Sequence, residues 1–314
     1  MLVVVDKYIP FLAEVLSPYA TVVPLEPYEI TPEAVKGADA LIIRTRTEAN
    51  RELLEGSKVR FIATATIGYD HIDTEYCEQT GIRWASCPGC NAQAVCDYVE
   101  EALDSIGAKS TIGVVGYGHI GTLVARMAEQ KGLQVLVNDP PKNTGVSLGE
   151  IEEKCDIITF HTPLTYAPNP YPTYHLCDAE FLKHCKKDAV IINAARGGIV
   201  DEKALLESGH RCVIDCWENE PDINRDLELS PNTLIASFHI AGYSWAGKMN
   251  ASRMCLDAFC KHFGITPLSI EKKALTLQPE TVGDSSKGWL NRVSEQLKSH
   301  PESFEQLRKQ YKLR

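Results

Sequence analysis

The 314-residue sequence lacks a long apolar run, and none of its runs approaches the roughly 20 residues that a membrane-spanning helix needs. The N-terminal stretch MLVVVDKYIP has no basic lead and only a short apolar run, which is not typical of a secretory signal peptide. Basic residues are also few, because 32 Lys and Arg stand against 42 Asp and Glu for a net charge of −10. We therefore expect a cytoplasmic protein that binds neither membranes nor nucleic acid.

Cysteine is not scarce, but the number of cysteines, eleven, is odd, and their spacing is not that of a disulfide framework. We therefore expect reduced thiols that pack as small hydrophobic side chains. The pair in 87-CPGC-90 could be a redox dithiol or half of a zinc site. A dithiol needs a surrounding fold that stabilises the thiolate, and zinc needs a second ligand pair, which the sequence does not supply. We interpret Pro88 and Gly89 as a tight turn where two domains could hinge, and we expect no metal.

The length exceeds that of a single core and predicts two domains. Short apolar runs alternate with helical patterns in two series, which is typical of parallel sheets covered by helices. The first series is LVVV, TVVPL, ALIIR and VRFIAT, and the second, from residue 111, is TIGVVG, LQVLVN, DIITF, AVIINA, CVIDC and TLIASF. Residues 91–107 predict a helix between the series, and the polar tail 286–314 predicts helices that break near Pro301.

A glycine loop predicts a dinucleotide site. Gly116, Gly118 and Gly121 form G-x-G-x-x-G after a strand and at the start of a helix, where backbone N–H groups can bind a pyrophosphate. Asp139 ends the next strand, about 20 residues on, and its carboxylate would bind a ribose diol and repel a 2′-phosphate. NAD is therefore expected rather than NADP, and Lys142 is interpreted as a solvated loop charge.

Three predicted strand ends carry groups suited to acid–base chemistry on a hydroxy acid. Arg196, in NAARGGIVD, could grip a carboxylate in bidentate fashion. His239 follows another strand and could take a hydroxyl proton, with a neighbouring carboxylate to favour its imidazolium form. Asp215, Glu218 and Glu220, in DCWENEP, are the candidate carboxylates, and spacing alone does not choose among them.

These motifs, with PGCNA, NDPP, FHTPL and HIAGYSWAGK, resemble the D-isomer-specific 2-hydroxyacid dehydrogenases, and within them the branch that acts on 4-phosphoerythronate. The resemblance implies an α/β fold of two doubly wound parallel-sheet domains, a Rossmann NAD domain and a flavodoxin-like substrate domain, with a short C-terminal extension. It implies a substrate domain over 1–92, an NAD domain over 93–250, and a return helix with a shortened dimerisation segment over 251–314.

The resemblance also implies residue roles. Arg196, Glu220 and His239 would be catalytic, with Arg196 on the substrate carboxylate and Glu220 paired with the histidine. Cofactor contacts would come from Gly116, Gly118, His119, Ile120, Gly121, Asp139, Thr162, Asp215 and Gly242. Substrate contacts would come from Thr45, Thr66 and Tyr243, and Arg44 or Arg46 could hold a phosphate. In the tail, Arg308 or Lys309 could reach a neighbouring subunit's site, although a solvated helix face is the favoured interpretation of these charges.

The resemblance implies NAD-dependent oxidation of 4-phospho-D-erythronate to 2-oxo-3-hydroxy-4-phosphobutanoate, in vitamin B6 synthesis. The expected substrate is thus a phosphorylated hydroxy acid, and the expected assembly is a homodimer. Glycerate or 3-phosphoglycerate is an alternative substrate, and a non-catalytic NAD-sensing scaffold is an alternative of another class. The C-terminal region is shorter than the dimerisation domain familiar in this branch.

Overall fold

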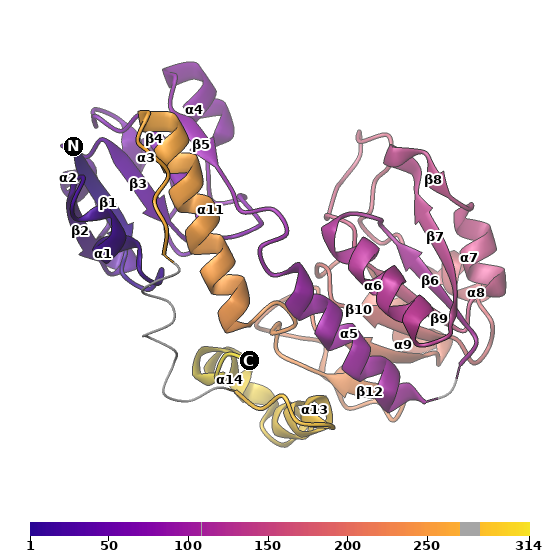
Figure 1. Cartoon of the computed structure of the whole chain (residues 1–314). Coiled ribbons are helices and arrows are strands. Elements are labelled where there is room, and N and C mark those ends of the chain that lie inside the picture. Colours follow the sequence, from indigo (N-terminus) through magenta and orange to yellow (C-terminus); the bar gives the residue numbers. More distant parts are fainter. Residues whose placement is uncertain (108, 271–282) are drawn as a thin grey trace. The chain divides into compact units, whose positions relative to one another are not determined.

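The computed structural model describes residues 1–107, 109–270 and 283–314 (Figure 1). The chain forms two compact units. The first combines Met1–Asn91 with the described part of Ser244–Thr281, and the second combines Ala92–Tyr243 with the described part of Val282–Arg314. The expected boundary after residue 92 lies within one residue of the observed division between Asn91 and Ala92. The expected boundary at 250 falls inside a helix that belongs wholly to the first unit.

The first unit contains a five-stranded parallel sheet with the order β2-β1-β3-β4-β5, the order of flavodoxin-like folds. Its strands are β1 (Leu2–Asp6), β2 (Thr21–Leu25), β3 (Ala40–Ile43), β4 (Phe61–Thr64) and β5 (Arg83–Ala85). Strands β3 and β4 are buried at every position, as expected for a parallel sheet with both faces covered. The four runs of the first predicted series are confirmed as strands, while β5 has no apolar pattern that would have predicted it.

Helices cover this first sheet. They are α1 (Leu12–Leu16), η1 (Pro27–Glu29), α2 (Pro32–Val35), α3 (Arg51–Leu54), α4 (Thr74–Thr80) and α11 (Trp245–Phe263). Helix α11 packs against β4 and places Cys255, Leu256 and Phe259 in the same apolar core as Phe61 (Figure 1). Because these side chains are buried in the core of the first unit, the whole of α11 belongs to that unit, and the unit does not end at residue 250.

The second unit contains a seven-stranded sheet with the order β12-β11-β10-β9-β6-β7-β8. The strands are β6 (Thr111–Val115), β7 (Gln134–Asp139), β8 (Thr144–Gly145), β9 (Ile157–Phe160), β10 (Val190–Asn193), β11 (Arg211–Ile214) and β12 (Thr233–Ala236). All pairs are parallel except β7 with β8. All six strands of the second predicted series are confirmed, and the order is that of a Rossmann sheet with a short antiparallel edge.

The helices of the second unit begin with α5 (Ala92–Ile106), which confirms the helix predicted over 91–107. The others before the C-terminal segment are α6 (His119–Gln130), η2 (Pro140–Lys142), α7 (Leu148–Lys154), α8 (Ala179–His184), α9 (Glu202–Ser208) and α10 (Arg225–Glu228). Most of the shorter helices begin at an Asp, Ser or Asn whose side chain accepts a hydrogen bond from the first turn, as at Ser147, Asp178 and Asp201.

The C-terminal segment packs on the second unit. It consists of α13 (Trp289–Ser299), η3 (Pro301–Ser303) and α14 (Phe304–Gln310), so the predicted break near residue 301 is confirmed. Helix α13 contacts β12 and α5, and the buried Trp289, Leu290 and Phe304 belong to the same core as the sheet.

All eleven cysteines lie among the described residues, and all are buried with free thiols, which confirms the prediction of cysteines packed as small hydrophobic side chains. Cys87 and Cys90 flank a tight turn in which the Cys90 N–H donates to the Cys87 carbonyl and Gly89 has φ of +79°. Burial raises the pKa of Cys90 to about 12, which disfavours a reactive thiolate. No helix among the described residues is long and apolar enough to cross a membrane.

Candidate active site

The glycine loop between β6 and α6 requires glycine at two positions. Gly116 has φ of +91°, and a Cβ there would lie 2.7 Å from the carbonyl of His161. A Cβ on Gly121 would lie 1.9 Å from the carbonyl oxygen of Gly116. Gly118 precedes the first turn of α6 and has open space around it, followed by His119 and Ile120. The loop therefore brings the backbone close to the N-terminus of α6, an arrangement that suits a pyrophosphate.

Asp139 stands at the end of β7, as the sequence predicts. Its Oδ2 accepts a 2.8 Å hydrogen bond from the Tyr117 N–H of the glycine loop. Lys142 donates through Nζ to the Tyr117 carbonyl and lies 3.8 Å from Oδ2 of Asp139. The interpretation of Lys142 as a solvated charge is thus incomplete, because its ammonium helps to hold the loop while staying half exposed.

Two buried polar atoms beside the loop lack a hydrogen-bond partner among the described residues. They are Oγ1 of Thr162 and Nδ1 of His161. The Thr162 side chain is a neighbour of Gly116, with its methyl carbon 3.0 Å from where a Cβ on Gly116 would lie, so Thr162 stands beside the loop. Unpaired buried hydroxyls are costly and need a partner, and a bound dinucleotide would supply one. The residues present therefore fit NAD.

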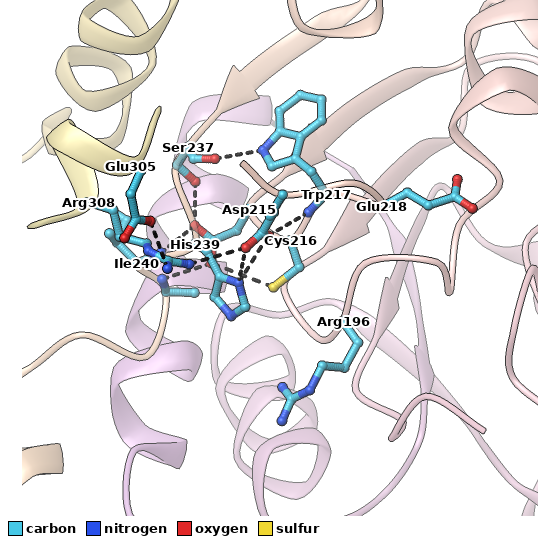
Figure 2. Close-up of polar contacts among 12 residues, drawn as sticks. Arg196, Asp215, Cys216, Trp217, Glu218, Ser237, His239, Ile240, Glu305 and Arg308 are labelled. Carbon is cyan, nitrogen blue, oxygen red and sulfur yellow. Dashed lines mark hydrogen bonds and ion pairs between the residues drawn. The ribbon is translucent and has the colours of Figure 1, made fainter. Parts of the chain in front are cut away.

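Arg196 and His239 stand at one edge of the second sheet. Arg196 follows β10 and His239 follows β12, with β11 between them, so their backbones leave the carboxyl ends of strands that are parallel and closely spaced. The amide of Asn193 holds the Arg196 loop by donating to the carbonyls of Arg196 and Cys216. In Figure 2 the side chains of Arg196 and His239 project toward the same side of these strand ends.

The structure selects one carboxylate for the histidine. Nδ1 of His239 lies 2.8 Å from Oε2 and 3.0 Å from Oε1 of Glu220. The backbone N–H of Trp217 donates to Oε1 of Glu220 at 2.9 Å and fixes the carboxylate. The imidazole therefore carries its Nδ1 proton toward Glu220 and keeps Nε2 for another partner.

The surroundings of His239 favour its protonated form. Burial alone would lower the pKa of His239, but contacts with Cys216 and Glu220 outweigh burial, and the pKa lies well above its usual value. Burial raises the pKa of the Cys216 thiol as well, while His239 opposes this rise. Glu220 is the carboxylate hydrogen-bonded to the imidazole, and its charge stabilises the imidazolium.

Asp215 holds the turn that carries His239. Its carboxylate is fully buried and accepts hydrogen bonds from the Ser237 hydroxyl and from the N–H groups of Ile240 and Ala241. His239 itself has φ of +58°, a conformation that costs energy for a residue with a side chain. The contacts of Asp215 stabilise this backbone, so a cofactor contact, as expected for Asp215 and for the nearby Gly242, would add to an existing positioning role.

Glu218 has a different partner from Glu220. Its Oε1 lies 2.7 Å from Nε2 of His175 and 3.3 Å from the hydroxyl of Tyr174. Figure 2 shows Glu218 extending away from His239. The choice that the sequence left open among three carboxylates is thus made by side-chain direction.

Four of the expected substrate residues belong to the first unit, and the fifth, Tyr243, is a partly exposed residue of the second. Thr45 and Arg46 are exposed after β3, and Thr66 follows β4 with its hydroxyl 2.6 Å from that of Thr64. Arg44 makes two hydrogen bonds to the buried carboxylate of Asp6, at 2.8 and 3.1 Å. Part of the Arg44 charge is therefore already neutralised before any phosphate binds.

One functional candidate, Lys248, was missed in the sequence, and the contact of another, Arg308, was not predicted. Lys248, in the first turn of α11, is half buried, and burial together with the positive charge of Arg44 lowers its pKa. Arg308, in α14, donates to Oε2 of Glu220 at 3.3 Å. The favoured interpretation of the tail as a solvated face is wrong for Arg308, although Lys309 is 58% exposed. The motif GYSWAGK, which ends in Lys248, could have drawn attention to this residue, whereas the sequence does not signal the contact of Arg308 with Glu220.

Comparisons with known proteins identify relatives of this chain. Residues 100–241 match the model of the D-isomer specific 2-hydroxyacid dehydrogenase NAD binding domain. The erythronate-4-phosphate dehydrogenase of Bacteroides fragilis is 47% identical, with 100% of this chain and 97% of that protein covered. The enzyme of the same name from Pseudomonas fluorescens is 40% identical, with 85% and 74% covered.

Among solved structures, the NAD+-bound 3-phosphoglycerate dehydrogenase of Entamoeba histolytica has a TM-score of 0.68 and 26% identity, over 84% of this chain and 95% of that one. Together with the glycine loop and Asp139, these similarities identify NAD as the cofactor. The chain therefore belongs to the erythronate-4-phosphate dehydrogenase branch of the D-isomer specific 2-hydroxyacid dehydrogenase family.

Proposed function

We propose that this chain oxidises 4-phospho-D-erythronate at C2 to 2-oxo-3-hydroxy-4-phosphobutanoate, with reduction of NAD+, on the route to pyridoxal 5′-phosphate. The observation that carries the proposal is the His239–Glu220 pair at 2.8 Å, at the same sheet edge as Arg196, in a chain 47% identical over its full length to a protein of that name. Glycerate and 3-phosphoglycerate are less well supported, since the structural neighbour that acts on the latter is 26% identical.

The residues of the second unit divide the work. When bound, NAD+ accepts a hydride from C2 of the substrate. Nε2 of His239 takes the proton of the C2 hydroxyl, and Glu220 stabilises the imidazolium that results. Arg196 binds the substrate carboxylate and polarises the developing carbonyl. In balance, the hydroxy acid and NAD+ give the 2-oxo acid, NADH and one proton.

The first unit supplies groups that suit a phosphate. Arg44 is held by Asp6, while Lys248 is partly desolvated and forms no ion pair among the described residues. Burial and then the charge of Arg44 lower the pKa of Lys248, while the Asp6 carboxylate acts in the opposite direction. A phosphate dianion would bring a second anion to these two cations and favour the charged form of Lys248. Thr45, Thr66 and Arg46 are further proposed contacts, as is Tyr243 of the second unit.

The setting is also part of the proposal. Eleven buried free thiols suit a reducing cytoplasm. A homodimer is proposed because of the family resemblance. Light scattering after size exclusion tests the dimer.

The decisive experiment mixes the purified protein and NAD+ with 4-phospho-D-erythronate, D-erythronate, D-glycerate and 3-phospho-D-glycerate, and follows NADH absorbance. We expect the highest kcat/KM for 4-phospho-D-erythronate and a large loss without the phosphate. Equal rates with D-glycerate would contradict the substrate assignment. Absence of hydride transfer with every acid, despite measurable NAD+ binding, would favour a scaffold that only senses NAD.

A further inference from the structure

Arg308 links the C-terminal segment to the acid–base pair of the same chain. Its Nη1 lies 3.3 Å from Oε2 of Glu220, and its Nη2 lies 2.8 Å from Oε2 of Glu305. Figure 2 shows Arg308 and Glu305 beside His239, on the side opposite Glu218. Oε2 of Glu220 therefore faces two cationic partners, the guanidinium and the imidazole.

The packing of the C-terminal segment defines where Arg308 stands. Phe304, at the start of α14, is 1% exposed. In α13 the Ser294 hydroxyl accepts from the N–H of Ala236, and Lys298 donates to the carbonyl of Thr233, so the segment is bonded along β12. Strand β12 leads directly into the turn of His239. The strand that carries the base and the helix that carries Arg308 thus form one packed structure.

The end of the chain adds a second attachment to the same turn. The Arg314 guanidinium donates to the carbonyl of Ala241 at 2.8 Å and lies over the Trp289 ring. The ring of Tyr311 packs edge-on against Phe238. Residues on both sides of His239 therefore contact the C-terminal segment, which argues against an incidental approach of Arg308.

The charges facing His239 come from several elements. Asp215 and Cys216 follow β11, Glu220 lies in the next loop, and Arg308 with Glu305 belongs to α14. Arg196 stands at the end of β10, and Arg314 and Tyr311 lie near Asp215. Among these, Arg308 is the cation bonded to the same carboxylate oxygen as the imidazole. A cation there opposes the imidazolium, while the hydrogen bond orients the carboxylate.

We propose that Arg308 is a positioning residue that holds the Glu220 carboxylate against His239 and limits how strongly this carboxylate binds the protonated imidazole. The C-terminal segment thereby sets the pH range in which His239 can accept a substrate proton. The inference rests on the proposed role of His239 as the base of the dehydrogenase.

The test compares Arg308→Gln, Arg308→Lys and the control Lys309→Gln in the full chain. Lys309 lies on the same helix and pairs with Glu305 at 3.6 Å rather than with Glu220. Two quantities are measured: the pH profile of kcat/KM for oxidation, and the titration of His239 by NMR in the protein without substrate. The NMR titration does not depend on turnover, so it separates failure of this inference from failure of the proposed function.

Removal of the Arg308 charge should make His239 hold its proton to higher pH, and the acid limb of kcat/KM should move upward by roughly 0.5 to 1 pH unit. Arg308→Lys should restore most of the wild-type profile, and Lys309→Gln should leave it in place. A uniform loss of rate at every pH, with an unchanged His239 titration, would overturn the inference and reduce Arg308 to a packing residue. If Arg308→Gln does not fold, Arg308→Met keeps the aliphatic stem and is judged by the same two measurements.

Discussion

Nδ1 of His239 lies 2.8 Å from Oε2 of Glu220, and this contact assigns different tasks to the two ring nitrogens. The nitrogen bonded to the carboxylate keeps its proton, so Nε2 is the atom that can take a proton from a substrate hydroxyl. Because 35% of the His239 side chain is exposed, Nε2 can reach a ligand without rearrangement of the strand end.

The first prediction concerns the base itself. His239→Ala should lower kcat for hydroxy acid oxidation by about 10²- to 10⁴-fold, the usual contribution of general base catalysis. NAD+ affinity, measured by titration calorimetry, should stay close to wild type because the glycine loop lies on other strands. His184→Ala, at a half-exposed histidine of α8, is the matched control and should keep both properties. Near-normal turnover in His239→Ala would remove His239 from the mechanism.

The second prediction concerns the sign of the Glu220 effect. Oxidation needs neutral His239, so activity falls as the pH drops below the raised pKa of this residue. Glu220→Gln removes the anion that favours the imidazolium, and the acid limb of kcat/KM should therefore move to lower pH while kcat decreases. Glu218→Gln provides the comparison, because Glu218 pairs with His175 and should not shift the limb. An upward shift in Glu220→Gln would contradict the assignment of the stabilising charge.

The third prediction uses the close approach of Gly121 to Gly116. Gly121→Ala places a Cβ 1.9 Å from a backbone oxygen, which forces the cofactor loop to move. NAD+ affinity should weaken by about tenfold or more, equivalent to roughly 1.4 kcal/mol or greater. Gly149→Ala in α7 is the control, since a Cβ there meets nothing within 4 Å. Equal affinities in the two variants would argue that the loop does not bind the cofactor.

Much of this architecture follows from local sequence. The runs ALII and VIIN are buried on both sheet faces, so each reads as a continuous apolar strand, and the glycines mark the turn between β6 and α6. The strand β5, RWA, escaped detection because three residues with a basic first position carry no apolar pattern. Its place at the sheet edge comes from pairing with β4, which is a tertiary interaction.

The site shows the same division between local and long-range information. The sequence predicts that Arg196 and His239 follow strands, and the structure places both at strand ends. The carboxylate that contacts the imidazole, however, depends on the directions of side chains in one short loop. Arg308 lies 88 positions from Glu220 along the chain, and Asp6 lies 38 from Arg44. Such contacts are set by the packing of whole elements, which a single sequence does not reveal.

The fourth prediction addresses phosphate recognition. Lys248→Met should raise KM for 4-phospho-D-erythronate by roughly 10- to 100-fold, the effect of losing one charge-assisted hydrogen bond. KM for D-erythronate should change little, because that acid has no phosphate to lose. Lys261→Gln, at an exposed position of the same helix, serves as the control. Equal increases of KM for both acids would argue for a general effect on the helix rather than a phosphate contact.

The last prediction tests whether Asp215 maintains the backbone of His239. The groups that bond its carboxylate are all donors, with Ser237 and Ile240 on Oδ1, and Ala241 and the Cys216 thiol on Oδ2. In Asp215→Asn the amide must therefore point its NH2 group at a donor in either orientation, and the charge is lost as well. Unfolding by urea should show a loss of about 1.5 to 3 kcal/mol, and kcat should fall because the φ of +58° at His239 is no longer stabilised. Asp104→Asn is the control, since its ion pair with Lys131 is exposed and such pairs contribute about 0 to 1 kcal/mol. Equal stability of the two variants would mean that the turn is held by other contacts, among which the attachment of Arg314 to Ala241 would be the next to remove.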